Sequence, residues 1–528
     1  MSRFDALPQT LDYRPDGMNM WDTWCIEHEG KIHLLHLQTL AHETKRPKED
    51  ANWLGHAISS DGLYWEEQPQ PFGPNTPGTR DDLQPWTGCL FTHAGTYYLY
   101  YTMRSSIDAT CGQHIGLATS RDMKTWERHP NNPIISPDPK WYISHERPLP
   151  PTVVDPAKPG EKRDVVDCRD LVIARDPKGK GFWGFYAART WAEESAEQSV
   201  IACVHSDDLI HWTHRPPAFA PRKYNCIEVP DVYQINGRWY LTCLTGNHYG
   251  SRRIFSDANV TKGTIFAVSD RPEGPYKEIE YDNVILGGNG WSAGYSLRTV
   301  MFQNERLAFY TQQYPEDQTA TISPPMRLRA SADGRLRLAY SPRVQGWRDR
   351  QIISPSDPPA IASQPVNHPQ WSGKGGRWLM DDSKYLGQSH TNYQIADLGI
   401  GAPSMEVEAT VKLLDGAGAG LVLRHGSEPH WVTGDFVFAI DAADQRVYAG
   451  RAAEFEEVYA RSFLVERGRA YHVRLCARGP RVEMFIDDDL YVQFTMKKPY
   501  PLNRTLGLFV DHGRAEISGV SAWALKTV

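Results

Sequence analysis

The sequence has few of the patterns that mark a metal-binding, disulfide-linked or membrane-inserted protein. Its eight cysteines are irregularly spaced and include no Cys-x-x-Cys pair. Buried free thiols in a reducing compartment are therefore a simpler interpretation than zinc ligands or disulfide bonds. The N-terminal segment, Met1 to Asp22, is polar, and no later stretch has the apolar length of a membrane span. We therefore expect a cytoplasmic protein with no membrane partner.

The net charge is small, and few segments have the hydrophobic periodicity of a helix. The net charge is −7 over 528 residues, which argues against nucleic acid as a partner. Short β-rich runs such as Tyr97–Thr102 and Trp239–Leu244 alternate with turns that contain Gly, Pro, Asn and Asp. The chain is too long for one ordinary domain, so we expect an all-β protein of two or three domains.

What the chain does have is a pair of signals that alternate five times. One is Ser-x-Asp-x-x-x-Trp, intact from Ser59, Ser120 and Ser206 and degraded at Ser269 and Ser331. The other is a turn followed by an aromatic-rich strand, which begins at Gly30, Gly95, Gly181, Gly237 and Asn304. A repeat that carries strands rather than helices predicts a β-propeller, here of five blades, whose inner strands converge on one axis.

The repeats end before residue 350, and the composition and strand spacing of the sequence then change. We assign residues 1–350 to the propeller and residues 351–368, which are rich in proline and serine, to a linker. Residues 369–528 contain predicted strands separated by turns at short, regular intervals. That spacing is typical of a β-sandwich of the jelly-roll type.

Acidic residues stand just ahead of three of the five turn-and-strand signals. Asp22, Asp170 and Glu228 hold this position in blades one, three and four, and Thr87 and Ser296 hold it in blades two and five. In a propeller these positions meet at one mouth of the axial channel. Carboxylates crowded into a low-dielectric pocket push their pKa values apart, so that one can be a nucleophile and another a proton donor. Glycoside hydrolysis requires such a pair.

Two other interpretations of the acidic residues are open. A single Asp at a strand start is commonly a turn residue, although three in register are harder to explain in this way. A cation held by the three carboxylates is the other interpretation. No Asp- or Asn-rich loop surrounds them, so we expect neither a metal nor a cofactor.

Several segments of the propeller region carry motifs that can be compared with known families. The first reads Trp53-Leu54-Gly55-His56-Ala57-Ile58-Ser59-x-Asp61. The others are Trp86-Thr87-Gly88-Cys89, Gln113–Ser120, Asp167-Cys168-Arg169-Asp170, Glu228-Val229-Pro230-Asp231, Pro325–Leu328 and Asp333–Leu336. Together they resemble the motifs of glycoside hydrolase family 32, the β-fructofuranosidases, inulinases and levanases. The resemblance extends over the propeller region and implies a catalytic propeller followed by a sandwich.

The resemblance implies an exo-acting enzyme that uses a retaining double displacement. Asp22 would be the nucleophile at the anomeric carbon, and Glu228 the general acid and then the base. Asp170, with Arg169 beside it, would hold sugar hydroxyls and stabilise the oxocarbenium-like transition state. Asp176 matches the family's Arg-Asp-Pro motif more literally, but it stands too close to Gly181 to begin an inner strand.

The chain departs from the family around the predicted nucleophile. Where the family has Asn-Asp-Pro-Asn-Gly, this chain has Trp21-Asp22-Thr23-Trp24-Cys25. Losing these polar side chains should change which sugar fits, because a polar pocket rejects a sugar that lacks a hydroxyl partner. We therefore expect hydrolysis of a β-linked furanoside, fructosyl first, with an arabinofuranoside as the alternative.

Nine residues are predicted to bind substrate: Arg169, Trp21, Trp24, Gln38, Trp53, Trp86, Thr87, Gln113 and Arg298. Indole rings combine an apolar face with a polar edge and suit sugar stacking, but about half of the four tryptophans are expected to be core residues instead. Gln38 and Gln113 resemble family positions near the sugar ring. Arg298 could reach the axis and bind hydroxyls or a carboxylate, whereas Asp231 is expected to brace Pro230 or Arg169.

Two further functions stay open. An inverting furanosidase, like the related arabinanase propellers, would use the same three carboxylates. Its pair would stand about 6.5–9.5 Å apart, against about 5–5.5 Å for retention. A catalytically silent carbohydrate-binding propeller would explain the altered motifs, but decay should have removed at least one carboxylate. In every case the partner is an oligosaccharide or small glycoside, and a homo-oligomer is compatible with the sequence.

Overall fold

The computed structural model describes residues 12–40, 53–107, 113–147, 166–179, 181–192, 197–246, 261–279, 283–288, 294–314, 319–362, 376–425, 435–451, 456–496 and 504–526. They form an all-β structure, as predicted. The described residues fall into two compact units, residues 12–338 and residues 339–526. Within these ranges no helix is long and apolar enough to cross a membrane.

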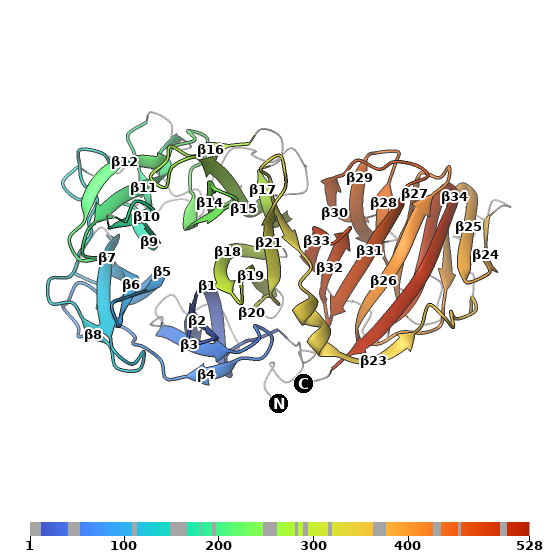
Figure 1. Cartoon of the computed structure of the whole chain (residues 1–528), viewed down its shortest axis with the longest axis horizontal. Coiled ribbons are helices and arrows are strands. Elements are labelled where there is room, and N and C mark those ends of the chain that lie inside the picture. The colour runs from blue at the N-terminus through green and yellow to red at the C-terminus, as the bar shows by residue number, and fades with distance from the viewer. Residues whose placement is uncertain are drawn as a thin grey trace. The chain divides into compact units, whose positions relative to one another are not determined.

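The first unit is the predicted five-bladed propeller, with its blades arranged around a central axis (Figure 1). Blade one contains β1 (Met18–His28), β2 (Lys31–Leu40), β3 (Trp53–Ser59) and β4 (Glu66–Gln68). Blade two contains β5 (Gln84–His93), β6 (Thr96–Arg104), β7 (Gln113–Ser120) and β8 (Glu127–Arg128). Blade three contains β9 (Cys168–Arg175), β10 (Phe182–Arg189), β11 (Ser199–Ser206) and β12 (Thr213–Phe219).

The last two blades carry additional strands. Blade four contains β13 (Glu228–Ile235), β14 (Arg238–Gly246), β15 (Lys262–Ser269) and β16 (Lys277–Glu278), and β17 (Val284–Gly288) pairs with β15. In blade five, β18 (Gly294–Phe302) pairs with β19 (Glu305–Tyr314), which pairs with both β20 (Thr319–Ile322) and β21 (Met326–Ala330). β22 (Leu336–Ala339) follows. Apolar residues of β1 and β2 pack against those of β18 and β19 in one core cluster, which closes the ring between blades one and five.

The Ser-x-Asp signals form the same turn after the third strand of blades one, two and three. In each turn the Ser hydroxyl donates to the Asp carboxylate at 3.0 Å (Ser59 to Asp61, Ser120 to Asp122, Ser206 to Asp208). The same hydroxyl accepts the backbone N–H three residues on, at 2.8–2.9 Å. These hydrogen bonds replace backbone pairing at the turn, so this half of the repeat serves the fold rather than the chemistry.

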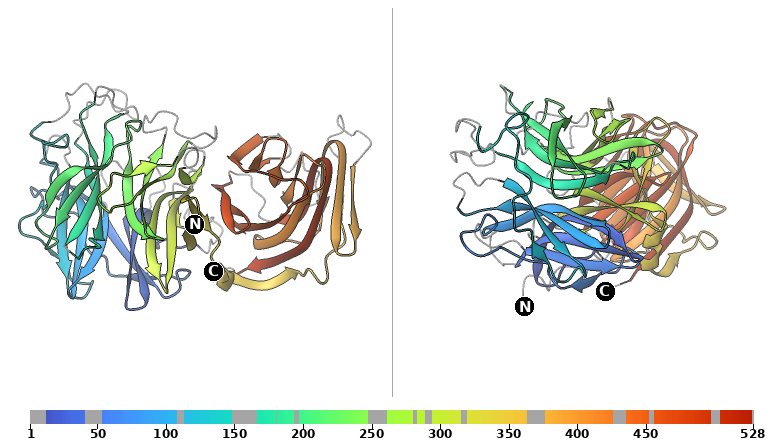
Figure 2. Two further views of the ribbon diagram at one scale, coloured as in Figure 1. Left: turned by 45° about the horizontal axis from the view of Figure 1, so that its top comes forward. Right: turned by 60° about the vertical axis from the view of Figure 1, so that its left-hand side comes forward.

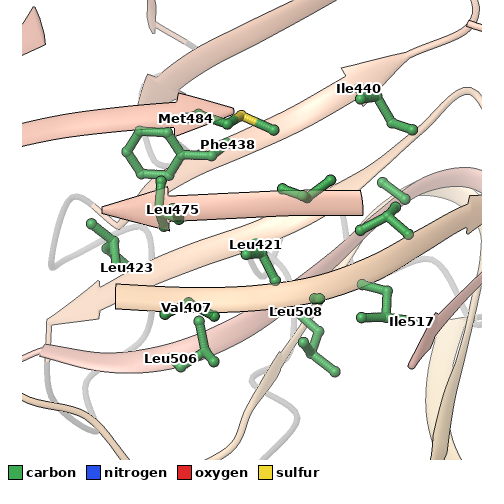
Figure 3. Packing of buried hydrophobic residues seen from close by; sticks show 14 of the residues in the cluster. Val407, Leu421, Leu423, Phe438, Ile440, Leu475, Met484, Leu506, Leu508 and Ile517 are labelled. Carbon is green, nitrogen blue, oxygen red and sulfur yellow. The ribbon is translucent and has the colours of Figure 1, made fainter. Parts of the chain in front are cut away.

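The second unit is a β-sandwich, also as predicted. Its strands are β23 (Arg348–Ile353), β24 (Gly376–Asp381), β25 (Lys384–Asp397), β26 (Ser404–Leu413), β27 (Gly418–His425), β28 (Phe436–Asp441), β29 (Arg446–Arg451), β30 (Glu456–Ser462), β31 (Ala470–Arg478), β32 (Arg481–Ile486), β33 (Asp489–Thr495) and β34 (Arg504–Leu525). Alternating residues of these strands, among them Val407, Leu421, Phe438, Leu475 and Ile517, form one buried core (Figure 3).

Strand β34 belongs to both layers of the sandwich. It is one long, curved strand, dark red in Figure 2. Residues 504–511 pair with β27, and residues 515–524 pair with β26. Between them His512 and Gly513 adopt positive φ of 37° and 121°. A Cβ at Gly513 would lie 2.5 Å from the Cα of Gly416, so only glycine allows this close approach.

The units divide between residues 338 and 339, and the chain just after this point belongs to the sandwich. Residues Pro342–Trp347 form a 3-10 helix, η5, and β23 follows directly and pairs with β34. The sequence pattern instead assigns residues up to 350 to the propeller and begins a linker at 351. The pairing of β23 with a strand more than 150 residues away leaves no mark in local composition. Residues 363–368 of the predicted linker lie outside the described residues.

Candidate active site

Every inner strand of the propeller begins with an irregularity that turns a side chain toward the axis. The pairing register shifts between Trp21 and Thr23 in β1, Trp86 and Gly88 in β5, Glu228 and Asp231 in β13, and Tyr295 and Arg298 in β18. In β9 it shifts opposite Phe185 and Ala187. A bulge leaves one residue unpaired and bends the strand, so the same device positions one polar site in all five blades.

The backbone is held in an unusual conformation at these bulges. Asp22, Asp170, Val229 and Ser296 have φ of 28°, 63°, 52° and 54°, a region that residues other than glycine rarely adopt and that clusters at functional sites. In blade four the positive φ falls on Val229, so Glu228 stands one residue earlier than Asp22 and Asp170 do in their blades. The prediction that the three acidic residues hold equivalent positions in their blades is therefore wrong for Glu228, which is displaced by one residue.

Asp22 is held by hydroxyl groups from two other blades. Ser296 Oγ donates to its Oδ1 at 2.8 Å, and Thr87 Oγ1 donates to its Oδ2 at 2.9 Å. Both oxygens of the carboxylate therefore have a fixed orientation at the axis. This is what an attacking carboxylate needs, because a nucleophile must be held in one geometry toward the reacting carbon.

Asp170 is deeply buried and bonded to its neighbours through its own backbone as well as its side chain. Its Oδ2 accepts the backbone N–H of Val229 at 2.9 Å, and its N–H donates to Thr102 Oγ1 at 3.0 Å. Thr102 Oγ1 in turn donates to the carbonyl of Thr87 at 2.8 Å. Blades two, three and four are thus linked at the predicted site by one chain of hydrogen bonds.

Glu228 pairs with Arg169 through one carboxylate oxygen. Nε and Nη2 of Arg169 lie 3.3 and 3.1 Å from Glu228 Oε2. Among the described residues no hydrogen bond reaches Oε1, and the side chain keeps 18% of its exposure. One oxygen of Glu228 is therefore fixed by the protein, and the other is accessible to a bound molecule.

Arg169 joins most of the predicted polar groups. It lies 2.8 Å from Asp167 and 3.6 Å from Asp170, and its Nη1 donates to Gln113 Oε1 at 3.3 Å. Gln113 also accepts the backbone N–H of Cys168 at 3.2 Å. A buried arginine with this many partners is a fixed positive charge between the carboxylates.

The three carboxylates interact electrostatically within this pocket. Burial raises the pKa of Asp22, the charge of Glu228 raises it further, and the bonds from Ser296 and Thr87 oppose the rise. Burial also raises the pKa of Asp170 to about 7, with Glu228 and Asp22 adding to the rise and Arg169 opposing it. Mutual repulsion of this kind requires proximity, so the structure brings Asp22, Asp170 and Glu228 together.

The predicted aromatic contacts divide into two groups. Trp21 and Trp86 are partly buried beside the core between blades one and two, and the Arg104 guanidinium lies 4.0 Å from the centroid of Trp86. Trp53 is 43% exposed, and its ring would be 2.4 Å from a Cβ on Gly73. These three rings are partly exposed.

Three other predicted contacts are buried. Trp24 is 2% exposed and belongs to the core. Gln38 is 3% exposed, on β2 opposite Trp53. Arg298 is 2% exposed, and Nη1 donates to the carbonyl of Pro230. Its positive charge lowers the pKa of Asp22, against the larger effect of burial.

Some residues of the site are absent from the predicted set. Thr102 and Cys226 carry no sequence signal, and they reach the site because Thr102 lies on β6 and the Cys226 Sγ lies 3.2 Å from Arg169 Nη2. Asp167, two residues before Arg169, could have been found from the acidic-basic run that contains it. It also binds Arg189 Nε at 2.7 Å. Asp176, by contrast, lies in a turn at the far end of β9, where it accepts the N–H of Lys178.

Comparison with known proteins supports the family resemblance read from the motifs. Residues 23–156 match the glycosyl hydrolases family 32 N-terminal domain. The matched region covers most of blade one and all of blade two; it begins just after Asp22 and ends before Asp170 and Glu228. The grouping of the three carboxylates therefore rests on the structure. No curated protein matches the chain in sequence.

Solved structures of family 32 enzymes share the fold over nearly the whole chain. A β-fructofuranosidase of Bombyx mori superposes with a TM-score of 0.68 at 15% identity, covering 98% of this chain and 94% of that one. A sucrose-6-phosphate hydrolase from Lactobacillus gasseri gives 0.69 at 13% identity, covering 99% and 93%. A fructan 1-exohydrolase from Cichorium intybus gives 0.64 at 14% identity, covering 100% and 98%. At these identities the similarity shows the fold alone, a propeller followed by a sandwich.

Proposed function

We propose that this chain is a retaining, exo-acting glycoside hydrolase that cleaves a β-linked furanoside, with fructosyl as the first sugar. The observation that carries the proposal is the grouping of three carboxylates, Asp22, Asp170 and Glu228, with Arg169 paired to the last two. The similarity to family 32 enzymes supports it, since a variant of the Bombyx mori enzyme was solved with sucrose and a variant of the chicory enzyme with 1-kestose. The substrate is accordingly an oligosaccharide or a small glycoside.

In the proposed reaction, residues of this chain act as the nucleophile, the acid and the base. The Asp22 carboxylate attacks the anomeric carbon, the bond to the leaving oxygen breaks, and Glu228 donates its proton to that oxygen. Water then attacks the glycosyl–Asp22 ester, Glu228 takes the proton of that water, and the Asp22 carboxylate is released. Asp170 would accept hydrogen bonds from sugar hydroxyls, and Arg169 would hold Glu228 in place.

The test uses the full chain and two matched variants. Purified protein, Glu228→Gln and Asp176→Asn are incubated with sucrose, fructo-oligosaccharides and aryl furanosides of fructose and arabinose, and released sugar is measured. We expect fructose release that falls about 10²–10⁴-fold in Glu228→Gln and is unchanged in Asp176→Asn, whose carboxylate lies in a turn. Loss of activity in both variants would contradict the assigned role of Glu228.

Two other outcomes would change the proposal. Release from arabinofuranosides alone would favour the arabinofuranosidase alternative, which the Trp21 replacement beside Asp22 motivates. The anomer formed first, read by NMR, separates retention from inversion. Sugar binding without release from any substrate would identify a silent carbohydrate-binding propeller.

A cytoplasmic location is also proposed. The seven described cysteines are free thiols, as expected in a reducing compartment. Secretion of the natural protein, detected by cell fractionation, would contradict it.

A further inference from the structure

A second cavity occupies the axial channel of the propeller, away from the three carboxylates. Its volume is about 500 Å³, and all five inner strands line it. None of Asp22, Asp170 and Glu228 is among its lining residues, whereas residues further along the same strands are, such as Ile26, Phe91 and Ile173. The cavity is therefore a separate site.

The charged groups around this cavity are unbalanced in favour of arginine. Arg175, Arg298 and Arg306 line it, against the carboxylates Glu27 and Asp231. Both carboxylates have other partners. Asp231 Oδ2 accepts the N–H and the hydroxyl of Thr299, each at 2.9 Å, and Glu27 accepts the N–H of Gly30 at 2.9 Å. Asp231 therefore braces β18, and the predicted bracing of Pro230 or Arg169 is wrong.

Arg298 carries the strongest indication that something binds here. The side chain is 2% exposed, and one nitrogen, Nη1, donates to the Pro230 carbonyl. The other two, Nε and Nη2, are buried and have no hydrogen-bond partner in the described part of the chain. Because a guanidinium cannot lose its charge in a protein, leaving two of its N–H groups without acceptors at such depth is costly.

The other two arginines stand where they could complete an anion site. Arg306 Nη1 donates to Thr299 Oγ1 at 3.0 Å, the same hydroxyl that is bonded to Asp231. Arg175, on the more exposed side, donates through Nη2 to the Thr92 carbonyl at 2.7 Å. The charge of Arg298 also acts on Cys25 and Cys89, two thiols in the cavity wall, where it opposes the rise of their pKa caused by burial. The charge of Asp231 acts on both thiols in the opposite direction.

We propose that this second cavity binds an oxyanion, a phosphate or a phosphate carried by a small metabolite, through Arg298 and Arg306. Guanidinium groups bind phosphate oxygens through paired, charge-assisted hydrogen bonds. The volume leaves room for an organic group attached to the phosphate. The proposal does not depend on the hydrolytic activity, and its tests do not measure that activity.

The first experiment locates the anion directly. Crystals of the full chain are soaked in selenate, an oxyanion whose selenium is found by anomalous scattering. We expect a peak in the cavity within hydrogen-bond distance of the Arg298 or Arg306 guanidinium. Well-diffracting soaked crystals with no peak in the cavity would overturn the proposal.

The second experiment measures affinity in solution at constant ionic strength. Inorganic phosphate and a hexose phosphate are titrated calorimetrically into the wild type, Arg306→Gln and Arg121→Gln. Arg121 is an exposed arginine of blade two that bonds the Gly95 carbonyl, so its variant controls for a general loss of positive charge. We expect Arg306→Gln to weaken binding about tenfold, since one charge-assisted hydrogen bond is lost, and Arg121→Gln to bind like the wild type.

Each outcome of the titration has a definite meaning. Equal affinity for both ligands supports an inorganic anion as the occupant, and tighter binding of the hexose phosphate supports a phosphorylated metabolite. No binding to the wild type, or equal weakening by both substitutions, would overturn the proposal. The thermal midpoints of the variants show whether each one is folded.

Discussion

At the scale of single residues, the site depends on one arginine among several carboxylates. Arg169 contacts Asp167, Asp170 and Glu228, and their charges raise its pKa against the effect of burial. Even so, this one positive charge does not offset the burial of Asp170, whose pKa is raised to about 7. Asp170 is therefore the group whose ionisation should be most visible in the stability of the folded chain.

We expect Asp170→Asn to stabilise the protein more at pH 8 than at pH 5. The pKa of Asp170 is higher in the folded chain than the ordinary value of about 3.9 in the unfolded chain. Its contribution to stability is therefore present at low pH and is lost as the pH rises through about 7. The difference between variant and wild type should grow by about 2 kcal/mol between the two pH values. Thermal unfolding at both pH values measures it, and a difference independent of pH would contradict the raised pKa.

At the scale of strands and turns, the two sequence signals have different roles. The turn-and-strand signal follows an inner strand whose bulge presents Asp22, Thr87, Asp170 or Ser296 at the axis. The Ser-x-Asp signal closes a turn, where Ser206 Oγ bonds both Asp208 and the buried N–H of Leu209. Mutations in the second signal should therefore change stability without changing the site.

We expect Ser206→Ala to lower the free energy of unfolding by about 1–2 kcal/mol, because the N–H of Leu209 loses its acceptor. Ser331→Ala is the matched control, since Ser331 belongs to a degraded copy of the signal and its bond to Asp333 is exposed. Its effect should stay within about 0.5 kcal/mol. Thermal unfolding of both variants gives the comparison. An equal loss of stability in the two variants would contradict this explanation, which depends on burial of the Ser206 turn.

At the scale of the whole molecule, the chain contains two units with separate cores. The propeller cores lie between neighbouring blades, whereas the sandwich has one large core of its own. Buried polar groups tie the start of the sandwich to its interior. Tyr340 donates to Glu406 at 2.7 Å, and Arg348 bonds both Glu406 and Glu408.

We expect residues 339–528 to fold when expressed alone and to unfold cooperatively on heating. The shorter fragment 369–528, which begins where the sequence pattern starts the sandwich, should be less stable. It lacks β23, which pairs with β34, and the buried Trp347. Circular dichroism measures whether each fragment is folded, and thermal unfolding compares the stability of the two. Equal stability would mean that residues 339–368 add nothing to this unit.

The sequence by itself determined the number of blades, the change to a sandwich and the identity of the three acidic residues. These follow from local spacing of turns and strands, and local spacing reflects hydrogen bonds and burial within one blade. The grouping of Asp22 with Ser296, which are 274 residues apart, could be inferred only because a propeller brings equivalent positions together.

Only the tertiary structure decided how the side chains are arranged at the axis. It placed Val229 at the bulge in front of Asp170, introduced Thr102 as a link between blades, put Trp24 in the core and set Arg298 in the wall of a second cavity. Two residues two positions apart on one strand can belong to different sites. One faces the carboxylates, and the other lines the opposite part of the channel. Spacing along the chain does not distinguish them. A single bulge reverses which face a side chain occupies, and bulges are formed by pairing between strands, not by the residues of one strand alone.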